Sequence, residues 1–497
     1  MPSSATRDSF ADQARKISPP SDAFIGGRFV PAVSGQRFSC LSPRDGALLA
    51  EVAECGPEDV DRAVRAAREA FEAGPWPRLS PQGRRKVLLR FARLIDENSH
   101  ELALLESLDM GKPVMDALHV DVPLTVRCFE FYAEAVDKLY DEVAPTGHDV
   151  VATITREPLG VVGAVVPWNF PLMLAAWKIA PALAAGNCVV LKPAEQSPLT
   201  ALRIAELADE AGFPPGVLNV VPGFGPTAGA ALGRHPEVDL IAFTGSGPVG
   251  RLFLRYAAES NLKQVALELG GKSPQLVFPD ADLDQAAQAV AGGVMFNQGE
   301  VCAAGSRLLV HESIREEFVA KVVDAAKAWT VGDPLDPATR VGALVEEKHL
   351  QRVLGHVEAA HADGARLLLG GNRARVSSGG WYLEPTVFDE VRPDARLAQE
   401  EVFGPVLAVL GFRTTEEAVA LANGTRFGLA AAVWTQHLTT AHQVSRALKA
   451  GSVWVNNFND SDITTPFGGY KESGNGRDRS LHALDKYTQL KTTWIQL

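Results

Sequence analysis

The feature that most constrains the fold is an alternation of short apolar runs with helical segments, which begins near residue 150. This alternation is typical of a parallel sheet covered by helices, because such strands are buried on both faces. The first runs are VVGAVV, NCVVLK, VLNVVP and DLIAFTG, and a second series after Cys302 contains SRLLVH, GARLLLGG, PTVFDEV, PVLAVLGF and GSVWVNN. The sequence therefore predicts two successive α/β domains.

The regions on either side of these series have different patterns. Residues 57–139 are predicted to be mostly helical, because apolar residues recur there at three- and four-residue spacing, in a first pattern over 57–74 and a longer second pattern over 81–111. The tail from Lys486, KYTQLKTTWIQL, alternates like an edge strand and could pair with 150–156 or with another subunit. With 497 residues, 46% of them hydrophobic, the chain can bury a large core divided between domains.

Composition and charge exclude several classes of protein. The formal net charge is -12 and Lys and Arg do not cluster, so a nucleic-acid-binding role is excluded. Residues 1–20 lack the apolar stretch of a secretory signal, so we expect a cytoplasmic protein. Prolines, Asn169 and Lys178 interrupt the apolar region 159–191, so no membrane span is expected. The five cysteines lack CxxC spacing, and we expect no metal site.

The most informative segment is FNQGEVCAAGSR, residues 296–307. Its Cys302 follows a glycine in a polar turn and has small neighbours. A nucleophilic thiolate needs this open approach, with backbone donors nearby. The alternative is a buried, inert thiol.

Two further segments carry polar side chains in apolar surroundings. Glu268 lies in VALELGGKSP, where burial would raise the carboxyl pKa toward the range of a general base. Asn169 lies in VVPWNFP between prolines and aromatic residues, where a fixed amide can donate to an oxyanion. The alternatives are a solvated glutamate at a strand end and an asparagine that caps a turn.

Seven segments together resemble the aldehyde dehydrogenase superfamily. In chain order they are PWNFP, KPAE, FTGS, LELGGKSP, GEVC, EEVFGP and PFGGYKESG, and the resemblance runs from about residue 20 to the C-terminus. Their order and spacing favour the catalytic interpretation of Cys302, Glu268 and Asn169. Glu300 in GEVC stands where many relatives carry Gln, and the family pattern allows either residue.

The resemblance implies a covalent mechanism. The Cys302 thiolate adds to an aldehyde, and the Asn169 amide and the Cys302 backbone N–H hold the oxyanion. Hydride then passes to NAD, and water activated by Glu268 releases the carboxylic acid. Lys178 is a further catalytic candidate, for proton movement or for lowering the thiol pKa, although most lysines are solvated.

The resemblance also implies a site for the cofactor NAD. FTGSGPVG supplies Gly245, Ser246 and Gly250 between a strand and a helix, where a pyrophosphate can bind, with a packing turn as the alternative. Lys192 and Glu195 in LKPAEQSP resemble the pair that holds the adenosine ribose. The other residues that the resemblance assigns to NAD are Glu401 and Phe403, near the nicotinamide and its ribose, and Val166, Pro167, Trp168 and Leu269.

The resemblance implies a fold in three parts. A Rossmann-type NAD-binding domain comprises 1–139 and 159–270, an α/β catalytic domain comprises 271–470, and a small β oligomerisation extension comprises 140–158 and 471–497. A homodimer or homotetramer is expected. The C-terminal stretch most resembles bacterial γ-glutamyl-γ-aminobutyraldehyde and related aminoaldehyde dehydrogenases of polyamine catabolism. The alternatives are a broad-specificity aliphatic dehydrogenase, a CoA-acylating relative and a catalytically silent binding relative.

Carboxylates near the expected substrate tunnel also favour an ω-amino or otherwise cationic or polar aldehyde as substrate. Asp460 and Asp462 lie in the loop that leads into the tunnel, and Glu106 and Asp109 lie one helical turn apart, so they can share a face. Such carboxylates would attract an ammonium group and repel an anionic semialdehyde. Solvated acidic surfaces are the alternative. The apolar walls are predicted to be Phe170, Trp177, Phe296 and Phe467.

Overall fold

The apolar runs of the first series form neighbouring strands in a computed structural model of the chain, which describes residues 9–497. Residues 1–8, which begin the polar N-terminal segment and the predicted 1–139 segment, lie outside the described residues. Strands β7 to β11 are parallel, as predicted, and β1 and β2 add an antiparallel edge. The sheet has the order β11-β10-β7-β8-β9-β1-β2, with β1 (Ala23–Ile25), β2 (Arg28–Val30), β7 (Val161–Val165), β8 (Cys188–Lys192), β9 (Leu218–Val220), β10 (Leu240–Gly245) and β11 (Gln264–Leu269).

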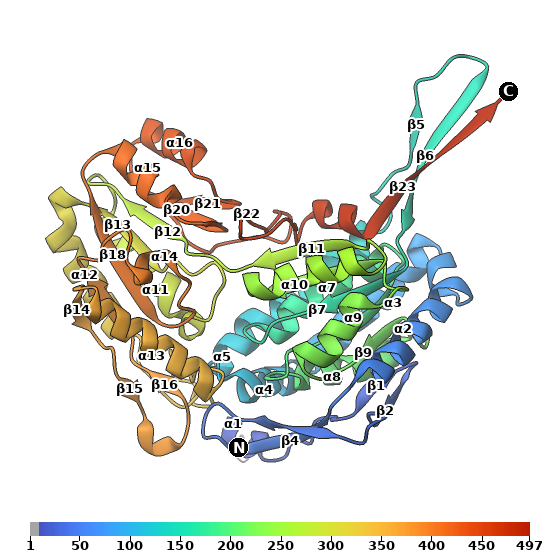
Figure 1. Ribbon diagram of the computed structural model, residues 1–497, viewed down its shortest axis with the longest axis horizontal. Coiled ribbons are helices and arrows are strands. Elements are labelled where there is room, and N and C mark those ends of the chain that lie inside the picture. Colours follow the sequence, from blue (N-terminus) through green and yellow to red (C-terminus); the bar gives the residue numbers. More distant parts are fainter. Residues whose placement is uncertain (1–8) are drawn as a thin grey trace, which may run out of the picture.

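The second series forms another seven-stranded sheet, which lies beside the first in Figure 1. Its strands are parallel except for β14, which runs antiparallel to β17 at one edge. The prediction of a second α/β unit is therefore confirmed. The order is β14-β17-β18-β13-β12-β20-β21, with β12 (Pro274–Val277), β13 (Arg307–His311), β14 (Arg366–Leu369), β17 (Thr386–Asp389), β18 (Val406–Phe412), β20 (Ala430–Trp434) and β21 (Ser452–Val455).

Helices pack against both sheets. Those with the first sheet are α2 (Pro57–Glu72), α3 (Pro81–Glu97), α4 (Ser99–Met110), α6 (Val122–Ala135), α7 (Pro171–Ala184), α8 (Leu199–Ala211), α9 (Ala230–Arg234) and α10 (Gly247–Glu259). Those with the second sheet are α11 (Leu283–Met295), α12 (Arg315–Lys327), α13 (Glu347–Ala362), α14 (Arg396–Gln399), α15 (Thr415–Asn423) and α16 (Leu438–Ala447). The region 57–139 is mostly helical, as predicted. Its long second pattern is divided between α3 and α4, because the Asn98 amide donates to the Leu94 carbonyl at 2.8 Å and caps α3.

A three-stranded sheet projects from these two bodies (Figure 1). It contains β5 (Glu142–Ala144), β6 (Val150–Pro158) and β23 (Thr488–Gln496). Strand β23 pairs antiparallel with β6, with Lys491 opposite Thr155, so the predicted pairing of the tail with 150–156 is confirmed. The apolar side chains of Leu490 and Trp494 on β23 are exposed.

Shorter elements complete the fold. They are α1 (Phe10–Ala14), α5 (Val114–Asp116) and the strand pairs β3 (Arg37–Leu41) with β4 (Leu48–Ala53), β15 (Arg373–Ala374) with β16 (Tyr382–Leu383), and β19 (Phe427–Gly428) with β22 (Tyr470–Lys471). Within residues 9–497, no helix has the length and apolar character needed to cross a membrane. In the same part of the chain the cysteines are unpaired, and no cluster of His, Cys, Asp and Glu is arranged to hold a metal ion.

Candidate active site

Cys302 lies in the loop that follows α11 and packs against the end of β11. A Cβ added at Gly271 would lie 2.7 Å from the Cys302 carbonyl oxygen, so a glycine is needed for this approach. The Cys302 thiol is partly buried and lines a cavity of about 440 Å³. The predicted nucleophile is therefore accessible to a small molecule.

The backbone before Cys302 is strained. Asn297 and Gln298 have φ angles of 50° and 45°, in the left-handed region that side-chain-bearing residues rarely adopt. The Asn297 amide donates to the carbonyl oxygens of Asn169 and Glu300, both at 3.1 Å. These bonds fix the loop against the segment that carries Asn169.

Asn169 is held with one amide hydrogen free. The side chain is 2% exposed, and its Nδ2 donates to the Glu300 carbonyl oxygen at 2.8 Å. An amide nitrogen carries two hydrogens, and within residues 9–497 the second has no partner. The arrangement can therefore supply a fixed donor beside the Cys302 loop, as an oxyanion requires.

Glu268, near the end of β11, is a buried carboxyl group without hydrogen-bond partners. It is 3% exposed, and neither carboxyl oxygen has a partner among the described residues. Burial and the charge of Asp478 raise its pKa to about 8, although Lys178 and Lys486 act in the opposite direction. A carboxyl with this pKa can exchange a proton near neutral pH, which suits a general base.

The surroundings of Cys302 favour the thiol over the thiolate. Burial, together with the negative charges of Glu401 and Glu268, raises its pKa to about 12. Backbone hydrogen bonds near Ala303 oppose this shift but do not reverse it. Formation of the thiolate therefore requires transfer of the proton to a base, and Glu268, whose charge acts on the thiol, is a candidate.

Lys178 lies behind Glu268 rather than at the thiol. Its ammonium group forms a buried ion pair with Asp478, and Lys486 pairs with the other carboxylate oxygen. Lys178 lowers the pKa of Glu268, whereas the largest influences on the pKa of Cys302 are burial and the charges of Glu401 and Glu268. Of the two roles predicted for Lys178, proton movement near Glu268 therefore fits this position better than thiol activation.

One group of predicted cofactor residues lies at the carboxyl ends of β8 and β10. Lys192 Nζ donates to Glu195 Oε2 at 3.1 Å. Among the described residues the Ser246 side chain makes no hydrogen bond to the start of α10; since Pro248 has no N–H, the N–H groups of Gly247 and Val249 are the donors that this helix start offers to an anion. A Cβ added at Gly245 would lie 2.4 Å from the Phe243 ring, so any larger residue here would have to displace that ring. The donors and open helix end fit a dinucleotide phosphate.

A second group lies between the two sheets. Glu401 Oε1 accepts from the Gly271 backbone N–H at 3.0 Å, and burial raises the Glu401 pKa to about 7. The Phe403 and Trp168 rings meet edge to face at 5.2 Å. The remaining residues assigned to NAD adjoin the ones already placed. The Val166 N–H donates to the Lys192 carbonyl at 3.2 Å, and Pro167 follows Val166 in the chain. Leu269 packs against Gly250.

The cavity beside Cys302 is walled by aromatic side chains. The predicted Phe170, Trp177, Phe296 and Phe467 all line it, and the Trp177 and Phe467 ring centroids are 5.4 Å apart. Sequence reasoning missed further wall residues, because they come from scattered segments without a shared motif. These are Trp329, Trp454 and Phe458.

The predicted carboxylate lining is largely wrong. Asp460 lines the cavity, whereas Asp462 is exposed outside it and accepts from the Thr464 N–H at 2.8 Å. Glu106 and Asp109 are fully buried away from the cavity, because α4 is enclosed by neighbouring helices. Their carboxylates instead accept hydrogen bonds from backbone N–H groups in the first turns of α7 and α8. Glu106 accepts from the Leu172 N–H at 3.2 Å, and Asp109 accepts from the Leu199 N–H at 2.8 Å.

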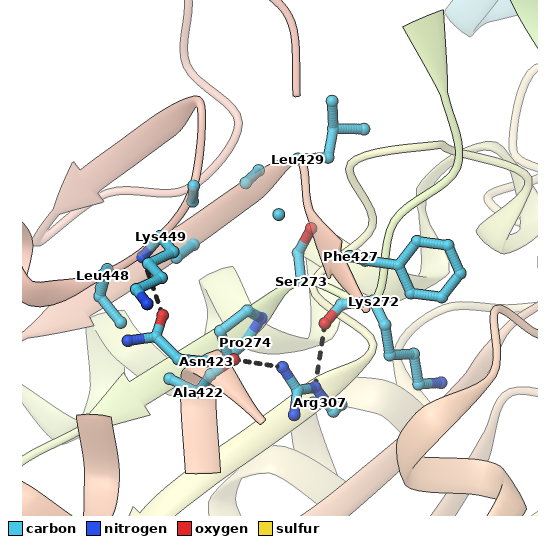
Figure 2. Close-up of a pocket in the computed structure, with 14 residues that line it drawn as sticks. Lys272, Ser273, Pro274, Arg307, Ala422, Asn423, Phe427, Leu429, Leu448 and Lys449 are labelled. Atoms are coloured by element: carbon cyan, nitrogen blue, oxygen red, sulfur yellow. Dashed lines mark hydrogen bonds between the residues drawn. The ribbon is translucent and has the colours of Figure 1, made fainter. Parts of the chain in front are cut away.

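A separate, much smaller pocket lies beside the start of β12 (Figure 2). Arg307 is buried there and donates to the carbonyl oxygens of Lys272 at 2.9 Å and Ala422 at 2.8 Å. The volume of about 10 Å³ matches about one water molecule, too little for an aldehyde or a nucleotide. Arg307 therefore joins β12 to α15 and forms no ligand site.

Comparisons with known proteins agree with this site. The aldehyde dehydrogenase family matches residues 29–493. The chain is 51% identical to the NADP/NAD-dependent aldehyde dehydrogenase PuuC of Escherichia coli, over 98% of each chain. Two solved structures are each 56% identical and cover 99% of this chain and 100% of theirs. They are indole-3-acetaldehyde dehydrogenase of P. syringae in complex with NAD+ and IAA, with a TM-score of 0.98, and γ-glutamyl-γ-aminobutyraldehyde dehydrogenase of Burkholderia cenocepacia, with a TM-score of 0.97.

The matched family and relatives span nearly the whole chain, and they include a structure with NAD+. The two-sheet fold and the cavity beside Cys302 fit the same conclusion. The chain therefore belongs to the aldehyde dehydrogenase family and is an NAD-dependent aldehyde dehydrogenase.

Proposed function

We propose that Cys302 carries the covalent intermediate, with Glu268 as the base and Asn169 as an oxyanion donor. Glu268 takes the thiol proton, and the thiolate sulfur bonds to the aldehyde carbon while the carbonyl π electrons move to oxygen. The oxyanion accepts hydrogen bonds from Asn169 Nδ2 and the Cys302 N–H. Bound NAD supplies the acceptor for the hydride that leaves this carbon. Glu268 passes its proton to solvent and then deprotonates the water that attacks the thioester carbon, which breaks the carbon–sulfur bond and releases the carboxylic acid and the Cys302 thiolate.

The observation that carries this proposal is the buried Glu268 carboxyl, which has no hydrogen-bond partner among the described residues and lies near enough for its charge to raise the pKa of the Cys302 thiol. The Glu268→Gln variant tests it by stopped-flow measurement of NADH. Loss of the base should slow both the first turnover and the steady state. A full, fast burst in this variant would restrict Glu268 to thioester hydrolysis and contradict its role at the thiol.

We infer that the physiological substrate is an aldehyde with an amino group at its far end, such as γ-glutamyl-γ-aminobutyraldehyde. The 56% identical Burkholderia cenocepacia relative bears that name. Asp460, which lines the cavity, supports attraction of an ammonium group. The buried Glu106 and Asp109 lend this assignment no support.

An aromatic aldehyde is the second candidate substrate. Seven Phe and Trp side chains line the cavity, and flat rings stack favourably on such walls. The P. syringae relative is named indole-3-acetaldehyde dehydrogenase. The same walls would also accept uncharged aliphatic aldehydes.

Specificity constants distinguish these substrates. The panel contains 3-aminopropionaldehyde, 4-aminobutyraldehyde, its γ-glutamyl derivative, hexanal, indole-3-acetaldehyde and succinate semialdehyde, each assayed with NAD. We expect an amino-terminated aldehyde to have the highest kcat/KM. Indole-3-acetaldehyde or hexanal as the best substrate would reject it and leave the general dehydrogenase activity.

We propose that the predicted three-part division holds, with the sheet of β5, β6 and β23 as an oligomerisation extension. The apolar side chains of Leu490 and Trp494 on β23 are exposed in the single chain. This supports contact of the sheet with a second copy of the chain, in a homodimer or homotetramer, where these side chains would be buried. Light scattering of the purified protein tests the oligomeric state. The cytoplasmic location stays a prediction.

A further inference from the structure

The cavity beside Cys302 contains two charged side chains of opposite sign. Asp460 comes from the loop after β21, and Arg479 comes from the segment before β23. No ion pair joins them within residues 9–497, where Asp460 Oδ2 accepts from Asn457 Nδ2 at 3.1 Å. The two charges are therefore separately available to a ligand.

Arg479 is a buried cation that no ion pair within residues 9–497 joins to a carboxylate, although the charges of Asp462 and Asp478 act on it. It is 6% exposed, and its Nε and Nη2 donate only to neutral oxygens: the Thr465 carbonyl at 3.2 Å, the Asp462 carbonyl at 2.7 Å and the Thr465 hydroxyl at 2.6 Å. Both hydrogens of Nη1 lack a partner among the described residues. Buried charges are normally paired, so a guanidinium whose Nη1 group has no partner is unusual.

The guanidinium lies among the aromatic walls of the cavity. Its central carbon is 5.5 Å from the Trp177 ring centroid and 5.9 Å from that of Phe467. Both rings line the same cavity as Cys302. The positive charge therefore sits within the cavity wall, where water is partly excluded and a carboxylate would bind more strongly than at the surface.

The backbone fixes the direction of Arg479. Its φ is 64° and that of Ser480 is 52°, both in the left-handed region. The neighbouring hydrogen bonds hold this conformation: the Ser480 N–H donates to Ile463 at 2.7 Å, and the Tyr132 hydroxyl donates to the Ser480 carbonyl at 3.0 Å. A strained conformation held in this way indicates a preorganised side chain.

We propose that Arg479 binds the carboxylate, and Asp460 the ammonium, of a substrate whose far end is an α-amino acid group. This inference rests on the proposed function and narrows it. A γ-glutamyl aldehyde carries both groups on one carbon, whereas a simple ω-aminoaldehyde leaves the guanidinium unpaired. The unpartnered Nη1 hydrogens can donate to a carboxylate oxygen, and such charge-assisted hydrogen bonds are stronger than bonds between neutral groups. Arg479 is thus a specificity-determining residue that distinguishes γ-glutamyl aldehydes from simple ω-aminoaldehydes.

The test uses a matched series of aldehydes with the same backbone. The γ-glutamyl derivative of 4-aminobutyraldehyde is compared with its 4-aminobutanoyl analogue, which lacks the carboxylate, and its glutaryl analogue, which lacks the ammonium. In the wild type the γ-glutamyl compound should exceed each analogue by about tenfold or more in kcat/KM, as expected for a charged hydrogen bond.

Substitutions then assign each preference to a residue. Arg479→Gln should abolish the preference over the 4-aminobutanoyl analogue, Arg479→Lys should retain part of it, and Asp460→Asn should reduce the preference over the glutaryl analogue. Arg127→Gln is the matched control, because Arg127 is exposed near Asp462 and outside the cavity. This control should leave all ratios unchanged.

A merely structural Arg479, which only holds the 462–465 loop, would lower all three rates in parallel. Equal ratios in the wild type and Arg479→Gln would therefore overturn the inference. If Arg479→Gln does not fold, equal ratios in the wild type and Arg479→Lys overturn it instead. Failure of the proposed function can be distinguished from failure of this inference. In that case hexanal or indole-3-acetaldehyde would have a higher kcat/KM than every aldehyde of the matched series.

Discussion

The electrostatics around Glu268 predict how turnover depends on pH. Burial and Asp478 raise the Glu268 pKa to about 8. A base must be ionised to accept a proton, so activity is expected to fall as pH decreases through this value. About a tenth of such a group is ionised at about pH 7 and about nine tenths at about pH 9, so kcat should rise about tenfold over this range when thioester hydrolysis limits turnover.

Two substitutions should move this pH profile in opposite directions. Asp478→Asn removes a charge that raises the Glu268 pKa and leaves the Lys178 and Lys486 charges unopposed. Its profile should therefore shift to lower pH, by about one pH unit or more. Lys486→Met removes a charge that lowers the Glu268 pKa, so its profile should shift to higher pH.

The assay measures kcat from NADH absorbance between about pH 6 and about pH 10, with thermal unfolding as a check on folding. The unfolding control matters because Asp478→Asn removes the carboxylate that pairs with both the Lys178 and the Lys486 ammonium groups, which is commonly destabilising. Glu268→Gln should remove the pH step itself. A flat wild-type profile, or equal shifts for Asp478→Asn and Lys486→Met, would refute the assignment of the step to Glu268.

Three further outcomes are expected. Cys302→Ala should abolish NADH formation while NAD binding, measured by calorimetry, is retained; continued turnover would exclude the thiol mechanism. Glu195 should favour NAD, since its carboxylate repels a 2′-phosphate, although Lys192 offsets part of that effect; equal or higher kcat/KM with NADP would contradict this. Asp109→Ala should lower the free energy of unfolding by about 1–3 kcal/mol, because it leaves the buried Leu199 N–H without a hydrogen-bond acceptor. The ratios of kcat/KM between substrates should not change; a change in these ratios would indicate that Asp109 contacts the substrate after all.

Strand positions could be predicted because burial on both faces produces continuous apolar runs. VVGAVV and DLIAFTG became β7 and β10, which pair directly in the parallel sheet. The break between α3 and α4 was missed, since the helical pattern continues across it. What ends α3 is a local hydrogen bond from Asn98, which outcompetes continuation of the helix.

The substrate residues show where sequence patterns stop being informative. Helical spacing correctly placed Glu106 and Asp109 one turn apart, but spacing alone does not indicate what that face of a helix contacts. The face of α4 that carries them lies in the interior. Conversely, Arg479 lines the cavity from a segment with no recognisable periodicity, where backbone strain sets its direction.

The glycines of the C-terminal motif explain how Glu268 acquires its ionic neighbours. The Gly476 N–H donates to the Leu267 carbonyl at 2.9 Å, and a Cβ at Gly476 would lie 2.8 Å from Glu268 Oε1. At Gly474, where φ is 115°, an added Cβ would lie 2.1 Å from the Leu267 carbonyl oxygen. The segment can therefore lie against β11 only without these side chains. This close approach brings Asp478, two residues beyond Gly476, near enough to raise the pKa of Glu268.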